Sequence, residues 1–169
     1  ALLATVFVGC TSSDDDVVAP PTLGSGDITG DYTTSKTFIK GNYNLIGTIR
    51  VKSGAILTFE AGSVITADVT NGADAVLVEN GGKLIVAGTA AEPVVFTEKS
   101  KTAGSWGGII MFGDAPIVSG KTTDGTPITS ATSEDGTNIV YGGTNAAHNG
   151  GSLKYVRVEY AGKKILDGN

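Results

Sequence analysis

The sequence predicts an all-β fold, a parallel β-helix of about four coils with a long corner loop. An internal repeat carries this prediction, because five positions of residues 49–62 (49, 51, 54, 57 and 59) match positions of residues 76–88 at a constant offset of 27. Both copies also alternate apolar and polar residues around a glycine. Alternation with a period of two is typical of half-buried strands, and repeats of roughly 20–50 residues indicate solenoids.

A strand–turn–strand unit of this length buries its apolar face only by stacking on a copy of itself. Adjacent coils then lie about 4.8 Å apart, and equivalent residues form ladders inside the helix. The expected interior ladders are Ile49/Val76, Val51/Val78, Leu57/Leu84 and Phe59/Val86. Outside the helix, Lys52 is expected to pair with Glu79, and Arg50, Leu77 and Ile85 are further outward positions.

Other segments extend the pattern in both directions. Residues 64–66 resemble residues 95–97, with the extra residues 90–93 expected at a corner. Weaker rungs are expected at 109–112 and at 153–160, and residues 27–45 are expected to cap the first coil, with a cap strand at 37–39. The alternative fold is a β-sandwich, which would pair these segments antiparallel.

Composition limits the classes of function. The chain has 25 glycines among 169 residues, which together with the alternation indicates many turns. Its net charge of −5 argues against a nucleic-acid partner, because such binding needs a basic surface. A single cysteine, Cys10, excludes an internal disulfide framework.

The first 26 residues suggest where the protein is located. Residues 1–9 are small and apolar, as at the end of a signal peptide, and Gly9-Cys10 resembles a lipobox whose cysteine is lipidated. Residues 10–26 are polar, acidic and proline-containing, and are expected to form a flexible tether. The alternatives are a buried N-terminal strand with a free cysteine, and an ordinary linker. The β-helix domain is assigned to residues 27–169, and the open pattern at its end predicts a longer parent protein.

Residues 119–152 break the coil pattern and form the predicted corner loop. Loops of this length in compact domains are usually functional or disordered. The candidate ligand contacts in and near it are Trp106, Asp124, Glu134, Asp135, Tyr141, Asn145 and His148. The oxygen-bearing side chains among them suit Ca²⁺, although their spacing matches no EF-hand loop. Trp106 is either packed against a coil edge or a stacking platform for sugar rings, and the loop is equally well a tolerated insertion.

Several motifs resemble a known family: Trp106-Gly-Gly, the turn at 113–116, Tyr141-Gly-Gly and the run 153–162. They are similar to the start of Bacteroidota surface lipoproteins with right-handed parallel β-helices of the pectin-lyase-like superfamily. The resemblance implies that the helix is right-handed and that the protein lies on the outer membrane, facing the exterior. Polysaccharide lyases of this fold use acidic Ca²⁺ ligands and an Arg or Lys base, and the outward positions identified above show no acidic cluster.

Three functions therefore remain open. The leading one is a non-enzymatic surface adhesin or glycan-binding module, whose partners are the outer membrane, through the lipid, and a polysaccharide or cell-surface glycan. The second is a polysaccharide lyase or hydrolase with its active site in a further C-terminal part. The third is a structural stalk. Fold alone does not choose among them.

Overall fold

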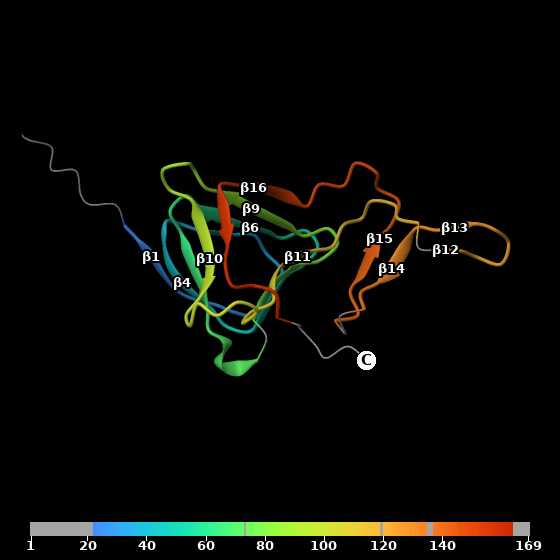
Figure 1. Cartoon of the computed structure of the whole chain (residues 1–169). Helices are drawn as coiled ribbons and strands as arrows, with labels where there is room; N and C mark the ends of the chain where they lie inside the picture. Colours follow the sequence, from blue (N-terminus) through green and yellow to red (C-terminus); the bar gives the residue numbers. More distant parts are fainter. Residues whose placement is uncertain (1–21, 73, 119, 135–136, 164–169) are drawn as a thin grey trace, which may run out of the picture.

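The computed structural model describes residues 22–163, apart from residues 73, 119, 135 and 136, and is a right-handed parallel β-helix (Figure 1). Each full turn of the chain, called a coil below, contributes three strands. The first coil holds β1 (Gly24–Ile28), β2 (Asp31–Tyr32) and β3 (Lys36–Phe38). The second holds β4 (Gly41–Leu45), β5 (Thr48–Val51) and β6 (Ile56–Glu60).

The later coils follow the same plan, with one addition each. The third coil holds β7 (Val64–Ala67), the 3₁₀ helix η1 (Val69–Asn71), β8 (Ala75–Val78) and β9 (Lys83–Ala87). The fourth holds β10 (Val94–Glu98), β11 (Gly108–Met111) and, after an inserted segment, β16 (Gly151–Lys154). The strand β17 (Val156–Val158) then begins a further coil.

The strands stack into three parallel sheets. Their orders are β1-β4-β7-β10-β17, β11-β8-β5-β2 and β16-β9-β6-β3. The registers confirm all four predicted ladders, and they also align residues 64–66 with residues 95–97. The predicted outward pair is confirmed too, because Lys52 Nζ lies 2.7 Å from Glu79 Oε1.

The interior of the coils is one apolar core. The ladder residues are fully buried, because each is covered by the equivalent residue of the next coil. A column of aromatic rings runs through it: Phe59 stacks on Phe38 at a centroid distance of 4.8 Å and meets the edge of Phe96 at 5.3 Å. This stacking makes the coils a rigid support for whatever lies on their outer faces.

The first coil corrects the predicted N-terminal boundary. β1 pairs with β4 from Gly24 onward, so residues 24–26 belong to the helix and not to the tether. The expected cap strand at 37–39 is part of the coil as well, because β3 pairs in parallel with β6. The pattern was hidden by the glycines of β1 and by Lys36, which occupies an inward position. Cys10 and the rest of residues 1–21 lie outside the described residues.

The run 153–160 also differs from expectation, since it forms two strands rather than one rung. β16 belongs to the third sheet and β17 to the first, and Tyr155 makes the corner between them with a positive φ of 45°. Val156 and Val158 do share the inward face, because they pair with the buried Val94 and Phe96.

The segment between β11 and β16 is structured rather than a simple corner loop. It contains β12 (Gly120–Lys121), β13 (Pro127–Ile128), β14 (Ser130–Thr132) and β15 (Val140–Gly142). β12 pairs antiparallel with β13, and β14 with β15. The β12–β13 hairpin extends away from the coils as an arm, whereas the β14–β15 pair lies closer to them (Figure 1). Across the described ranges, no helix is long and apolar enough to cross a membrane.

Candidate functional site

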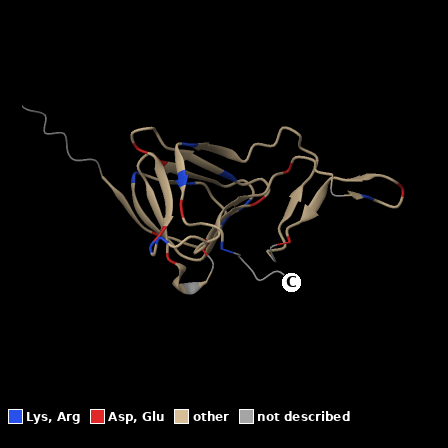
Figure 2. Ribbon diagram, in the orientation of Figure 1, with Lys and Arg blue, Asp and Glu red and all other residues tan. Residues whose placement is uncertain are grey.

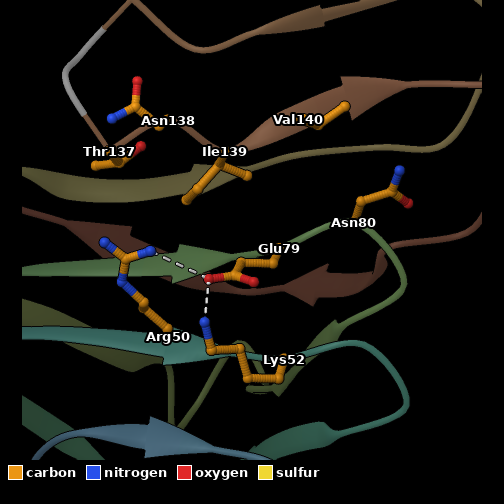
Figure 3. Close-up of a pocket in the computed structure, with 8 residues that line it drawn as sticks. All are labelled: Arg50, Lys52, Glu79, Asn80, Thr137, Asn138, Ile139 and Val140. Atoms are coloured by element: carbon orange, nitrogen blue, oxygen red, sulfur yellow. Dashed lines mark hydrogen bonds and ion pairs between the residues drawn. The ribbon is translucent and has the colours of Figure 1, made fainter.

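A groove of about 340 Å³ lies on the outside of the second sheet. One wall consists of side chains from β5 and from the end of β8, and the other is the inserted segment at residues 137–140 (Figure 3). The residues that line it are Arg50, Lys52, Glu79, Asn80, Thr137, Asn138, Ile139 and Val140. It combines charged and amide groups on the coil with an aliphatic lip on the insert.

The charged wall follows directly from strand alternation. Ile49 and Val51 point into the core, so Arg50 points outward from β5 and Lys52, the residue after the strand, points outward as well. The repeat then places Glu79 one coil above Lys52, where the two side chains meet. The backbone under this wall is held by ladders on both sides, so the charged groups have a fixed spacing.

The ion pairs form a connected set. Both Lys52 Nζ and Arg50 Nη1 contact the same oxygen, Glu79 Oε1, at 2.7 and 3.3 Å (Figure 3). Lys52 Nζ also lies 3.4 Å from Asp31 Oδ2, one coil below. The hydrogen bond to Glu79 raises the pKa of Lys52 above its usual value, with the Glu79 and Asp31 charges acting in the same direction and burial opposing it. Lys52 is therefore a cation at neutral pH and a hydrogen-bond donor, not a proton acceptor.

The aliphatic wall is anchored by a second, smaller apolar cluster. Ile139 is 7% exposed and belongs to a cluster with Ala75, Leu77 and Phe112 on the outer side of the second sheet. Leu77 faces outward beside Arg50, as predicted, and is fully buried there because the insert covers it. The insert therefore covers part of the sheet and leaves the groove along the edge of the covered area.

Polar contacts fasten the insert at the end of β8. Asn80 Nδ2 donates to Asp114 Oδ1 at 3.3 Å and to the Gly142 carbonyl at 3.4 Å. Gly142 has a φ of +78°, and a Cβ there would lie 2.4 Å from the Thr129 carbonyl oxygen. Only glycine fits this close approach, which lies within the insert where β15 pairs with β14.

Trp106 takes the packing role rather than the stacking one. Its side chain is fully buried in the main core, and its Nε1 donates to the Glu159 carbonyl at 2.7 Å. Trp106 also forms a parallel bridge with Ala161. Of the two alternatives for Trp106, the structure fits packing, because no face of the indole reaches solvent.

The other predicted contacts are not gathered into one site. Tyr141 is half-buried against Phe112, with ring centroids 6.1 Å apart. Asp124 lies at the exposed tip of the β12–β13 hairpin, where the Thr122 hydroxyl and the Thr126 amide donate to it. These bonds, led by the one from Thr122, lower the pKa of Asp124 to about 2.

Asn145 and His148 belong to the return of the insert toward β16. Asn145 Oδ1 accepts from the Ala147 amide at 3.1 Å, and the His148 amide donates to the Asn145 carbonyl at 3.0 Å. Glu134 is exposed, and Asp135 lies outside the described residues. Within the described part of the chain, no three His, Cys, Asp or Glu side chains are close enough to hold a metal ion together.

The groove was only half visible in the sequence. Arg50, Lys52 and Glu79 were identified as outward residues, but nothing marked them as one wall of a groove. The other wall is Ile139-Val140, an isolated aliphatic pair within a long polar stretch. Such a pair in a loop is a signal for docking onto a neighbouring surface, since apolar side chains gain by leaving water.

The comparisons with known proteins concern the family and not the groove. A family model described as a pectate-lyase-like beta helix domain matches residues 30–169. No curated protein and no solved structure matches the chain. The match covers more than half of the chain and includes every strand from β2 onward.

Proposed function

From the premise that the chain belongs to the pectate-lyase-like β-helix domain family, we propose that it is a non-enzymatic carbohydrate-binding module. Its binding site is the groove between β5, the end of β8 and the insert. One observation carries the proposal: a rigid row of ion-paired side chains faces an aliphatic lip across a groove of about 340 Å³.

The two walls match the two kinds of surface on a sugar. Arginine carries five N–H donors and lysine three, and carboxylates accept, so the charged wall offers both donors and acceptors to hydroxyl groups. Val140, which is 55% exposed, offers an apolar surface to the C–H face of a ring, and the buried Ile139 holds this part of the insert in place. Ligand sites commonly combine apolar lining with a few placed polar groups.

The chemistry of Lys52 favours binding over catalysis in this groove. A lyase base must accept a proton, whereas the pKa of Lys52 is raised by the hydrogen bond to Glu79. Both basic residues of the groove are engaged with the same carboxylate oxygen. A lyase or hydrolase activity elsewhere in a longer protein remains the second candidate, and a structural stalk the third.

The proposal includes a location at the cell surface, which rests on the sequence alone. Gly9-Cys10 followed by a polar and acidic run suits a lipidated cysteine on the outer membrane. Metabolic labelling with a fatty-acid analogue tests this, with Cys10→Ser as the control. Label that stays on the Cys10→Ser variant would refute the anchor.

The groove itself is tested by filling it. Val140 lines the groove and is 55% exposed, so Val140→Arg is expected to block the site with little cost to packing. The matched control is Val118→Arg, since Val118 is 83% exposed and is not among the lining residues. On a glycan array, the unaltered chain and Val118→Arg are expected to bind the same glycans and Val140→Arg to lose them. Equal binding by both variants would place the site elsewhere.

A further inference from the structure

The cations of the groove are already neutralised by the protein's own carboxylates. Arg50 and Lys52 share Glu79 Oε1, and Lys52 also contacts Asp31. Two positive and two negative side chains therefore form one connected set with no net charge. The chain as a whole carries −5, and Figure 2 shows acidic and basic residues spread over the coils and loops rather than gathered in one basic stripe.

Because of this balance, we propose that the groove selects neutral glycans over uronate-bearing or sulfated ones, and that Glu79 is the residue that sets this selectivity. The inference rests on the proposed function, since it names the class of glycan for the same groove. Glu79 is a binding and specificity residue in this proposal, with no catalytic role.

The position of Glu79 explains the selectivity. Its side chain is 19% exposed, compared with 30% for both Arg50 and Lys52, so the carboxylate lies deeper than its partners. A ligand anion reaching for Arg50 or Lys52 meets a carboxylate that already occupies the space between them. It would have to displace Glu79 or accept a like charge at close range, and like charges disfavour each other.

A neutral sugar has no such conflict. Its hydroxyl groups can accept from the guanidinium and ammonium N–H groups that the ion pairs leave available, and can donate to Glu79. The ion pairs stay in place, so the groove is organised before the ligand arrives. Preorganisation of this kind lowers the cost of ordering side chains on binding.

Replacing one oxygen of Glu79 tests the idea. Glu79→Gln keeps the shape of the side chain and removes its charge, which leaves Arg50 and Lys52 opposed only by Asp31. The matched control is Glu92→Gln, because Glu92 forms an ion pair with Lys40 at a corner that does not line the groove. Both variants change the net charge equally and each removes a lysine–glutamate pair, and Glu79→Gln also removes the pair with Arg50. Since Arg50 and Lys52 both line the groove, a difference between the variants belongs to the groove.

The probes are neutral gluco-, galacto- and manno-oligosaccharides and, at matched length, oligogalacturonates and a sulfated oligosaccharide, measured by calorimetry at low and high NaCl. The unaltered chain and Glu92→Gln are expected to bind a neutral probe with little salt dependence, and the anionic probes at least ~10-fold more weakly. Glu79→Gln is expected to bind an anionic probe about 10-fold more tightly than the unaltered chain does, and high NaCl is expected to remove this gain in affinity. Circular dichroism confirms that each variant is folded.

The outcomes separate the two proposals. Tighter binding of uronate or sulfated probes by the unaltered chain would overturn the selectivity and leave carbohydrate binding intact. Unchanged preference in Glu79→Gln would overturn the role of Glu79. If the unaltered chain shows no saturable binding of either neutral or anionic probes, the carbohydrate-binding function itself is overturned, and the selectivity with it.

Discussion

Lys36 occupies the interior position of the first coil that Leu57 and Leu84 fill in the next two. β3 pairs with β6 so that Lys36 lies beside Leu57, and Leu57 lies beside Leu84. The Lys36 ammonium turns back over the ring of Phe38, 4.9 Å from its centroid, and lies 6.0 Å from that of Tyr32. An inward-pointing lysine on a short edge strand is a device that discourages edge-to-edge pairing.

Replacing this lysine should therefore promote self-association through the first coil. Lys36→Leu is expected to increase self-association, because it leaves an apolar rung beside the edge strands β1, β2 and β3. Lys83→Leu is the control. Lys83 pairs with Ile56 away from the edge, so the substitution introduces the same apolar side chain at a position that is not on an edge strand. Sedimentation velocity at several concentrations measures the effect. Identical sedimentation-coefficient distributions for the two variants would show that Lys36 does not prevent edge-to-edge pairing.

The interior ladders should carry much of the stability. Leu84→Ala is expected to lower the free energy of unfolding by about 2–5 kcal/mol, because Leu84 is fully buried and its neighbours close the gap only partly. Thr58→Ala on the outward face of β6 should change it by no more than ~0.5 kcal/mol. Urea unfolding monitored by circular dichroism compares the two. Equal losses would mean that the ladders are not what holds the coils together.

Glu98 should make stability depend on pH. Glu98 is 2% exposed, and its carboxylate accepts from the Ser100 hydroxyl at 2.6 Å, the Ser100 amide at 2.7 Å and the Ser105 hydroxyl at 3.0 Å. These bonds, led by the Ser100 hydroxyl, lower the pKa of Glu98 from 4.5 to about 2. The charged form is thus favoured by folding. The contribution of charged Glu98 to the free energy of unfolding is complete above pH 4.5 and is lost as the pH falls toward 2.

The measurement is the free energy of unfolding at neutral pH and at steps below pH 4.5. Glu98→Gln is expected to be less stable than the unaltered chain at neutral pH, with a difference that shrinks as the pH falls. Glu134→Gln, at an exposed position of the insert, serves as the control. Parallel pH curves for the unaltered chain and Glu98→Gln would contradict the assignment.

The sequence was most informative where residues repeat. Leu57 and Leu84 share a 27-residue offset and an apolar character, and stacking requires both, so their ladder was predictable. Lys36 follows the same ladder at an offset of 21 residues with the opposite polarity, which hid the first coil. The groove was harder still, because it depends on where Ile139 docks. That contact joins a non-repeating insert to the outside of a coil, and no periodicity encodes it.

The last prediction concerns that docking. Ile139→Ala is expected to loosen the insert, because it removes most of a side chain that is 7% exposed and part of the cluster with Leu77. The coils have their own core, so they should remain folded while the cover over Leu77 is weakened. Hydrogen exchange should rise in β14, β15 and β8 and stay low in β6 and β9, and binding of a neutral glycan should fall.

The control for Ile139→Ala is a shortened arm, in which residues 122–126 are replaced by a Gly-Ser turn. These residues are exposed at the far end of the β12–β13 hairpin, and the contacts of Asn80 with Asp114 and Gly142 are left in place. The shortened arm should keep both the exchange pattern and glycan binding. Loss of binding in the shortened arm with full binding in Ile139→Ala would move the contact surface from the groove to the arm. Replacement of the whole stretch 119–152 cannot decide this, because it removes the first residues of β16 and uncovers Leu77 together with the groove.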